Sequence, residues 1–290
     1  MIQNNNSTAT GTTIAAVPSA LVRDAGHVRL RSDPRLRAIA WSDLLALTRH
    51  EIARELTISL PWLVASLAAA HWHLYLPALL ASFMFFLTGL RQVHNAYHYA
   101  LGLSRTATEW VMLVLSVLML GSMHAIQVNH LRHHRYCLGE EDVEAMSARL
   151  PAWRALLLGP WFPLRLHHAA LRAGSQRQCR WIGIELFANT VWIALVFAVF
   201  DNRVLEYHII AMALGQCLTA FFAVWTVHHD CGDGAFPART IRNRWKAWLT
   251  YAMFYHVEHH LYPAVPTCRL PILARRLDRV APELGALKVF

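Results

Sequence analysis

The apolar residues of this chain fall into two pairs of long stretches, each interrupted by a short polar break. Thirty-four almost continuously apolar residues begin at position 57, more than one membrane-spanning helix needs. A polar break at 71–73 divides them into predicted spans at about 57–71 and 75–93. Trp72 and Tyr75 fit an aromatic belt at a membrane interface, and the two histidines of the break are expected to be turn residues.

The second pair of apolar stretches predicts two further spans at about 181–200 and 207–227, joined by six polar or mixed residues. The polar side chains inside these spans include Glu185, Asn189 and Gln216. Polar groups are costly in lipid, so we expect all three to face the interior of the helix bundle.

The other segments are shorter or more polar. The apolar stretch 110–123 is short for a span and indicates a buried or re-entrant helix. Residues 153–166 form an amphipathic patch, and 41–56 predicts an amphipathic helix that lies on the membrane or is solvated. Residues 1–20 are polar and small and predict a disordered tail, which leaves 21–290 as a single membrane domain.

Three short histidine motifs stand beside the apolar stretches: HNAYH at 94–98, HLRHH at 130–134 and HVEHH at 256–260. In the second and third motifs the histidines are at positions i, i+3 and i+4, which share one face of a helix. They could be surface or hydrogen-bonded core histidines. Neutral imidazole is, however, the commonest metal ligand in proteins, so three such motifs favour a metal site.

The number of histidines bears on the number of metal ions. Eight imidazoles are too many for one ion, and two ions with four or five nitrogen ligands each is the simplest arrangement. Nitrogen ligands suit iron, zinc or copper. The Glu-rich motifs of soluble di-iron bundles are missing from the chain, so the residues alone do not name the metal.

Composition and charge support a membrane protein. The chain is 56% hydrophobic, with eleven Trp residues and a mean hydropathy of +0.30. Its net charge is +9, yet Arg203 is the single Lys or Arg in a predicted turn opposite the histidine motifs. This asymmetry follows the positive-inside rule, so the histidine face is expected to be cytoplasmic and nucleic acid is not an expected partner. The five cysteines have no paired spacing and are read as free thiols.

The motifs HNAYH, HLRHH and HVEHHLYPAVP, set between paired spans, resemble those of the membrane fatty acid desaturase and hydroxylase superfamily. The resemblance covers roughly residues 55–275. It implies an all-α integral membrane protein, with four transmembrane helices in two hairpins and a cytoplasmic helical cap that holds two non-haem irons. It also implies dioxygen as co-substrate, with two electrons used to oxidise an unactivated C–H bond.

The resemblance implies a ligand set when it is carried over residue by residue. The implied ligands are His94, His98, His130, His133, His134, His256, His259 and His260. Family members often add a ligand at the end of the fourth span, where this chain has His228 and His229. Two adjacent helical residues do not both face one site easily, and we favour His228 as a ninth ligand.

Other polar residues near the motifs are candidates for supporting roles. His124 lies on a different helix face from His130 and is interpreted as structural or as a support for the ligands. Glu258, Asp142 and Asp230 are either acceptors that orient a histidine ring or solvated carboxylates. The adjacent pair His167 and His168, with no third partner at helical spacing, is expected to be at the surface.

The functional hypothesis is an O2-dependent oxidoreductase that inserts a double bond into an acyl chain of a lipid or fatty acyl substrate. Alternatives are a hydroxylase or ketolase of a lipid, carotenoid or other hydrophobic molecule, and a non-catalytic metal-binding or transport protein. Electrons are expected from a separate ferredoxin, rubredoxin or cytochrome with its reductase. The expected location is a bacterial inner membrane, among membrane lipids.

An apolar substrate must reach the metals through a dry passage. We expect its walls to come from 110–123 and from apolar residues near the motifs, such as Tyr97, Phe254 and Tyr255. The alternative is that these side chains only pack the core, as aromatic residues often do.

Overall fold

The computed structural model describes residues 30, 32–231 and 236–289, so the whole of the predicted tail at 1–20 lies outside the described residues. The described chain is helical, and its one β pairing is an isolated bridge between Thr240 and Lys288. The α-helices are α2 (Pro34–Arg37), α3 (Arg49–Thr57), α4 (Leu60–His71), α5 (Tyr75–Tyr97), α6 (Arg105–Met119), α7 (Met123–Tyr136), α8 (Ala152–Leu158), α9 (Phe162–Ala173), α10 (Gln176–Leu195), α11 (Arg203–Thr219), α12 (Thr226–His228), α13 (Arg244–Leu249), α14 (His256–Leu261) and α15 (Leu270–Asp278). Two π-helical segments, η3 (Val196–Phe200) and η4 (Ala220–Trp225), extend α10 and α11. Short 3-10 turns are η1 (Ser42–Leu44), η2 (Glu144–Arg149), η5 (Thr267–Arg269) and η6 (Pro282–Gly285).

Four helical segments of the described chain are long and apolar enough to cross a membrane: Arg49–His71, Tyr75–Tyr97, Gln176–Phe200 and Arg203–His228. They coincide with the four predicted spans and extend past most of their predicted ends. The pair α6 and α7, bent by 111°, would make a fifth if it counted as one broken span. The bend agrees with the prediction of a short buried or re-entrant helix.

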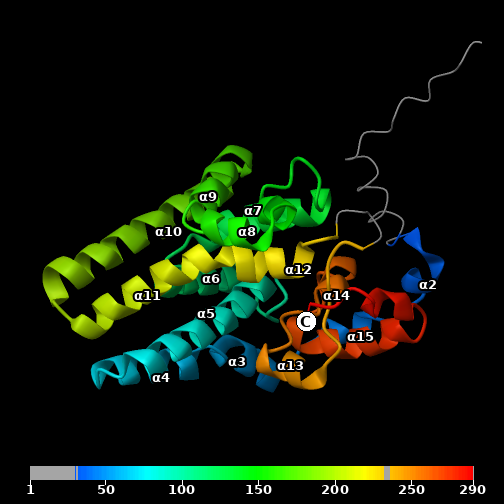
Figure 1. The fold of residues 1–290 in the computed structure, drawn as a ribbon, viewed down its shortest axis with the longest axis horizontal. Helices are drawn as coiled ribbons and strands as arrows, with labels where there is room; N and C mark the ends of the chain where they lie inside the picture. Colours follow the sequence, from blue (N-terminus) through cyan, green and yellow to red (C-terminus); the bar gives the residue numbers. More distant parts are fainter. Residues whose placement is uncertain (1–29, 31, 232–235, 290) are drawn as a thin grey trace, which may run out of the picture.

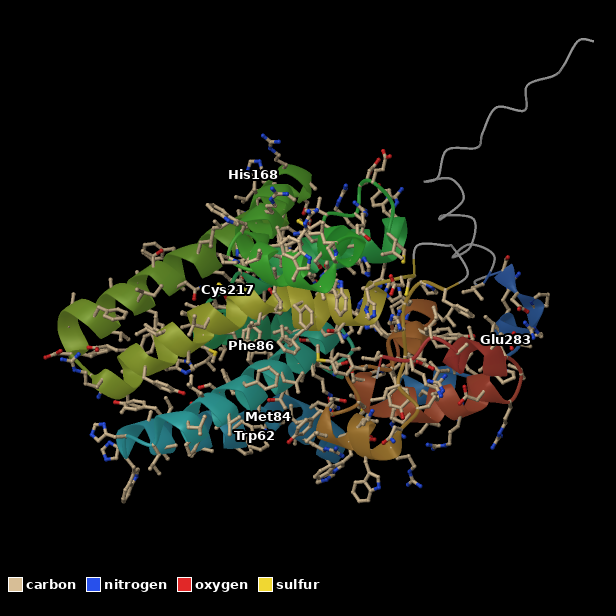
Figure 2. The ribbon with its side chains drawn as sticks, viewed as in Figure 1. Trp62, Met84, Phe86, His168, Cys217 and Glu283 are labelled. Atoms are coloured by element: carbon tan, nitrogen blue, oxygen red, sulfur yellow. The ribbon has the colours of Figure 1, made fainter. Side chains whose placement is uncertain are left out.

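The long helices pack in a bundle, and the short helices gather at one end of it. Helix α4 packs along α5, α11 packs against both, and α10 contacts α6 and α7. In Figure 1 the long helices run to the left, whereas α13, α14 and α15 lie together at the right with the C-terminus. On α5, Phe86 faces α11, while Met84 lies beside Trp62 on the lower side in Figure 2. Helix α5 is therefore the centre of the bundle, with α11 on one side of it.

The predicted amphipathic helix at 41–56 is only partly right. A helix begins at Arg49, where Thr48 and Glu51 form a capping box, and continues almost directly into the first span. Its residue Glu55 is buried, because the carboxylate accepts hydrogen bonds from Arg91 (2.5 Å) and from the amide of Asn95 (3.1 Å). This segment is therefore anchored in the bundle by a buried ion pair, which apolar periodicity does not reveal.

Polar side chains from α10 and α11 satisfy the backbone at the break between α6 and α7. Helix α6 ends at Leu120, whose left-handed backbone (φ 54°) stops the helix. Its free carbonyls accept hydrogen bonds: Leu118 from the His208 ring (2.9 Å) and Met119 from the Gln216 amide (2.7 Å). An unsatisfied backbone group in an apolar environment is costly, so these side chains stabilise the bend.

Glu185 supports the other half of the break. It is fully buried and accepts hydrogen bonds from the Ser122 hydroxyl (2.6 Å), the His124 backbone N–H (3.0 Å) and the His124 ring (2.8 Å). Asn189, one turn along α10, donates to the Ser116 hydroxyl (3.1 Å). The prediction that Glu185, Asn189 and Gln216 face the interior is confirmed, and each of these three residues touches the segment around this break.

We expect Glu185→Ala to lower the unfolding free energy in detergent by about 3 kcal/mol, because it leaves a buried hydroxyl and a backbone N–H without an acceptor. Glu185→Gln, which keeps an acceptor, should lose less. Thr190→Ala is the matched control, since Thr190 on the same helix is exposed and bonds only its own helix. A Glu185→Ala protein as stable as this control would contradict the role of Glu185.

Candidate metal centre

The three histidine motifs meet at the end of the bundle where the short helices gather. The first motif ends α5, the second is on α7, the third opens α14, and His228 ends α12. Eight of the nine histidines predicted as ligands are buried, and His98 is half-buried. The exposed fraction of His133 and of His260 is 0%, so water does not reach these rings.

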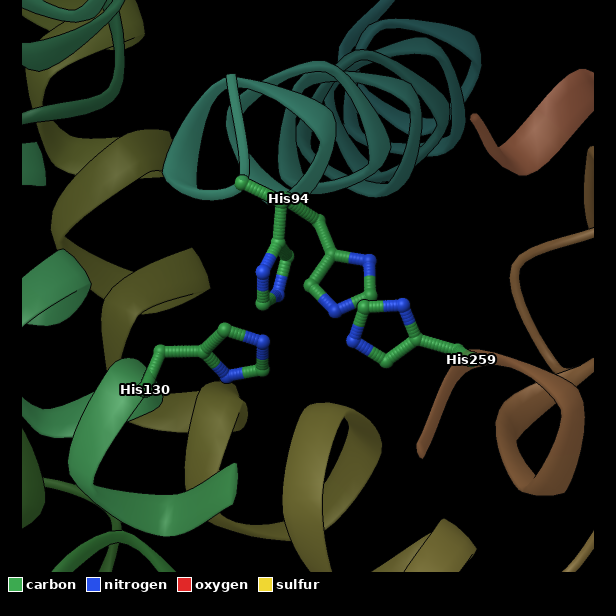
Figure 3. A group of neighbouring side chains, drawn as sticks. His94, His130 and His259 are labelled. Atoms are coloured by element: carbon green, nitrogen blue, oxygen red, sulfur yellow. The ribbon is translucent and has the colours of Figure 1, made fainter. Parts of the chain in front are cut away.

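The first group of histidines comes from α5, α7 and α14. Its members His94, His98, His130 and His259 each offer one ring nitrogen, and these nitrogens all lie within 4.8 Å of one another. In Figure 3 the four rings converge on one point between the helices. His134 adjoins this group, since its Nε2 lies 2.7 Å from Nε2 of His259 and 3.1 Å from Nε2 of His130.

The second group lies beside the first and comes from α7, α12 and α14. It consists of His133, His228, His256 and His260, again with one nitrogen of each within 4.8 Å of the others. Nε2 of His133 is 3.1 Å from Nε2 of both His228 and His260, and His228 and His256 are separated by the same distance. Of the adjacent pair at the end of the fourth span, His228 therefore enters the cluster. His229 instead bonds the Trp225 carbonyl (2.8 Å) and stacks on that indole ring.

Hydrogen bonds on the far side of several rings assign their tautomers. Nδ1 of His133 faces Asp142 (2.7 Å), Nδ1 of His130 faces Glu144 (2.9 Å), and Nδ1 of His228 faces the Pro237 carbonyl (2.9 Å). Each acceptor requires a proton on Nδ1, which leaves the lone pair of Nε2 directed into the cluster. Of the two alternatives left open for Asp142, the structure favours an acceptor that orients a histidine, and Glu144 is a second such acceptor that the sequence analysis missed.

The nitrogen spacing fits bound metal ions. Two nitrogens that are each about 2.1 Å from one ion and at right angles around it are about 3 Å apart. The pairs of the second group match this value at 3.1 Å. In the first group, Nε2 of His94 and of His98 is buried without a hydrogen-bond partner among the described residues. A donor set made only of imidazole suits iron, zinc or copper.

Burial keeps the imidazoles of the third motif uncharged. It lowers the pKa of His256, His259 and His260 well below 6.5, and the neighbouring histidines lower it further. These rings are therefore neutral at physiological pH, as metal ligands must be.

The two supporting carboxyl groups differ in their titration. Burial by itself would raise the pKa of Asp142. The contact with His133 and the hydrogen bonds from two backbone N–H donors outweigh burial and hold this pKa below its usual value. Burial raises the pKa of Glu144 to about 7. Asp142 is consequently ionised throughout the physiological range.

Neither Glu258 nor Asp230 orients a ring of the cluster, and for Asp230 the alternative of a solvated carboxylate holds. Glu258 points away from the histidines, as expected, but it pairs with Arg242 (2.6 Å) and accepts from the Thr240 hydroxyl (2.6 Å). Asp230 is 82% exposed and pairs with Arg239. Glu258 thus holds α14 to the segment that precedes α13 and does not orient a ring.

The other histidines that the structure describes lie outside the cluster. His124 bonds Glu185 and stacks on Trp181, which confirms a structural role. His168 is exposed on α9 (Figure 2), as predicted, but its neighbour His167 is half-buried and accepts from the Ser122 N–H (3.0 Å). The break histidines of the first pair of spans are exposed, in agreement with a turn.

Two cavities lie on opposite sides of α5. The smaller, here called the acyl groove, has a volume of about 390 Å³ and runs between α5 and α11 from Leu79 to Phe254. The larger, the arginine cavity, has a volume of about 1280 Å³ and includes Tyr255. Neither of these two cavities takes a wall from 110–123, where α6 buries Met112 and Met119 in the bundle core, so they give no support to that part of the predicted passage.

Comparison with known proteins agrees with this centre. A family model described as fatty acid desaturase matches residues 70–289. The chain is 25% identical over 268 residues to the sphingolipid delta(4)-desaturase/C4-monooxygenase of Homo sapiens, which covers 88% of this chain and 76% of that protein. It is 26% identical over 212 residues to the Bos taurus protein of the same name, covering 66% of this chain and 60% of the relative. The family match includes every histidine of both groups and most of the chain, and the chain therefore belongs to the fatty acid desaturase family.

Proposed function

We propose that this protein is an O2-dependent, di-iron membrane oxidoreductase that introduces a double bond into the acyl chain of a lipid or fatty acyl substrate. The observation that carries the proposal is the pair of adjacent, buried groups of imidazole nitrogens. Family membership supports a lipid oxidoreductase. Nine nitrogen donors divide naturally into sets of five and four, which is the capacity of two ions.

The residues that would hold the irons follow from the two groups. His94, His98, His130, His134 and His259 would hold one ion, and His133, His228, His256 and His260 the other. With two irons bound, the centre has the redox chemistry to use dioxygen against an unactivated C–H bond. Conversion of a CH2–CH2 unit with one O2, two electrons and two protons gives a C=C bond and two waters. The two external electrons require a separate donor protein, which we propose to be of the ferredoxin, rubredoxin or cytochrome type.

The protein's own residues prepare the site for this chemistry. Asp142 and Glu144 keep the Nδ1 protons of His133 and His130 in place, which directs the opposite nitrogens inward. Burial of the rings excludes water and so protects a reactive centre from side reactions.

The acyl groove supports a route for the substrate chain. Its wall is apolar, with Phe86 and Leu90 of α5 on one side and Leu214 of α11 on the other. It reaches Phe254, two residues before His256, and its 390 Å³ is within the range of about 300–1,000 Å³ usual for ligand pockets. A chain lying here would be in the bilayer region and would end beside the third motif.

We propose a topology of two hairpins with a cytoplasmic cap. The spans α4–α5 and α10–α11 would each return the chain to the side on which the histidines lie. The distribution of Lys and Arg, with Arg203 alone in an opposite-side turn, supports a cytoplasmic histidine face in a bacterial inner membrane.

Hydroxylation is the second candidate reaction. The name of the mammalian relatives includes both a desaturase and a C4-monooxygenase activity. Both reactions begin with removal of one hydrogen from a CH2 group and differ in whether a second hydrogen leaves or an oxygen is added. Product analysis separates them, because one product loses two hydrogens and the other gains one oxygen.

The first functional prediction separates the two adjacent histidines. The variants are expressed in a host with a compatible reductase, and the extracted lipids are analysed by mass spectrometry. His228→Ala should abolish the oxidised lipid product, because it removes a proposed ligand. His229→Ala should keep most of the product, since its ring faces Trp225. Equal activity of the two variants would contradict the assignment of His228.

The second prediction concerns the carboxylate behind His133. Asp142→Asn should lower iron affinity by about 10–100-fold, because it removes the charge that supports the ring and leaves a backbone donor of Leu138 or Ala145 unpaired. Affinity is measured by competition with a chelator. Glu141→Gln, on the exposed neighbouring carboxylate, is the control. Unchanged affinity in Asp142→Asn would show that Asp142 has no influence on the metal.

The third prediction tests the acyl groove. Leu214→Trp should shift the preferred substrate to shorter chains, because the added ring fills the end of the groove that is far from the histidines. Leu76→Trp on α5 is the control, since Leu76 is 72% exposed and lines neither cavity. If the chain-length profile of Leu214→Trp matches those of the wild type and of the control, this route is contradicted.

A further inference from the structure

The arginine cavity combines a strongly basic part with an apolar part. It lies between α3, α4 and α5 on one side and α13 and α15 on the other. The basic part contains Arg54, Arg91, Arg242, Arg244 and Arg275, and the acidic residue in the lining is Asp278. None of the nine clustered histidines lines this cavity.

Two of the five arginines are already neutralised. Arg91 pairs with Glu55 at 2.5 Å, and Arg242 pairs with both Glu258 (2.6 Å) and Asp278 (2.8 Å). The other three, Arg54, Arg244 and Arg275, are exposed and form no ion pair within the described chain. The cavity therefore has three free guanidinium groups and no free carboxylate, which favours an anion, and guanidinium groups bind phosphate by paired hydrogen bonds.

The apolar part of the cavity follows one face of α5 into the bundle. Pro77, Leu80, Ala81 and Met84 are spaced at i, i+3, i+4 and i+7, and Arg91 lies two turns further along the same face. From Pro77 to Arg91 the helix rises about 21 Å, most of the thickness of a hydrocarbon layer. The cavity thus has an apolar wall of membrane depth that ends at the arginines.

Helix α13 places the basic part at a membrane surface. Trp245 and Trp248 are 80% and 74% exposed, and Leu249 is 59% exposed. Exposed tryptophans of this kind are typical of the interface between lipid and water. An occupant with its anionic group among the arginines and its chain along α5 would therefore be a membrane lipid and not a soluble anion.

The turn before the third motif separates the two cavities. Thr250 and Phe254 line the acyl groove, whereas Tyr251, Ala252 and Tyr255 line the arginine cavity. Figure 2 shows the same division on α5, with Phe86 toward α11 and Met84 beside Trp62. A lipid with two chains could straddle this division, with one chain on each face of α5.

We propose that the arginine cavity binds the phosphate headgroup and one chain of a two-chain anionic phospholipid, whose other chain occupies the acyl groove and is oxidised. This inference rests on the proposed function, since it makes the phospholipid the substrate. Arg54, Arg244 and Arg275 would contact the phosphate, and the position of the headgroup would fix which carbon lies at the histidine cluster.

The test compares two triple variants with equal loss of charge. One is Arg54→Gln, Arg244→Gln and Arg275→Gln. The control is Arg165→Gln, Arg172→Gln and Arg180→Gln, three exposed arginines on α9 and α10. Native mass spectrometry measures retention of dipalmitoyl phosphatidylglycerol against dipalmitoylglycerol, a readout that needs no turnover. We expect the preference of the cavity variant for the anionic lipid to be about tenfold lower than that of the wild type, because three exposed charge pairs with the phosphate are removed.

The control variant, and a triple lysine variant at the cavity positions, should keep the preference. An unchanged preference in the glutamine cavity variant would overturn the proposal. So would displacement of phosphatidylglycerol by palmitoyl-coenzyme A, which would indicate a soluble acyl thioester as the occupant.

Turnover of the same two lipids in mixed vesicles tests the headgroup site separately from the proposed function. A wild-type protein that oxidises phosphatidylglycerol in preference to dipalmitoylglycerol, with the preference lost in the cavity variant, supports both. A wild-type protein that oxidises neither lipid contradicts the phospholipid as substrate, and one that also forms no oxidised product from the extracted lipids of the expression host contradicts the proposed function. One that oxidises both equally contradicts the headgroup site alone.

Discussion

Nine imidazole rings share one buried space, and several of their nitrogens lie about 3 Å apart with lone pairs directed at one another. Such an arrangement of neutral bases is repulsive unless a cation or a proton lies between them. Protons on the rings of the third motif are disfavoured, because burial lowers the pKa of these rings well below 6.5. The pairing of Asp142 with His133 commits the Nδ1 proton to the far side of that ring. This is the physical reason for proposing that metal ions hold the cluster together.

The fold must bring four separate segments to that space, and it does so with polar contacts that are unusual within apolar helices. Asn95, in the first histidine motif, receives hydrogen bonds from the N–H and hydroxyl of Thr267 and donates to Glu55. This links α3, α5 and the C-terminal segment. The bend between α6 and α7 directs the second motif toward the cluster, and His208 and Gln216 stabilise it by bonding free carbonyls. Substrate access has a simpler basis, since α5 offers one apolar face to each of two cavities.

The sequence predicts the features that depend on periodicity and on residue type. Four spans, a short broken helix and three clustered histidine motifs follow from hydropathy and from the spacing of histidines within each motif. Features that depend on tertiary pairing do not. Glu144 has no helical relation to His130 that would reveal their contact, and Glu258 bonds Arg242 only because the segment before α13 meets α14 and the end of α15, where Asp278 also pairs with Arg242. The walls of the passage were predicted from proximity along the chain. The cavities are instead defined by which faces of α5 remain uncovered, and this depends on packing.

The claim on which the function depends is that this cluster binds two iron ions, one in each group of histidines. The most direct measurement is the number of iron ions per chain in purified protein reconstituted with ferrous iron without oxygen, for the wild type and for His94→Ala and His260→Ala. We predict two iron ions per chain in the wild type, and no more than one in either variant, since each variant removes a ligand from a different group. A wild-type ratio of one or none, or a ratio that neither variant changes, would contradict the di-iron centre.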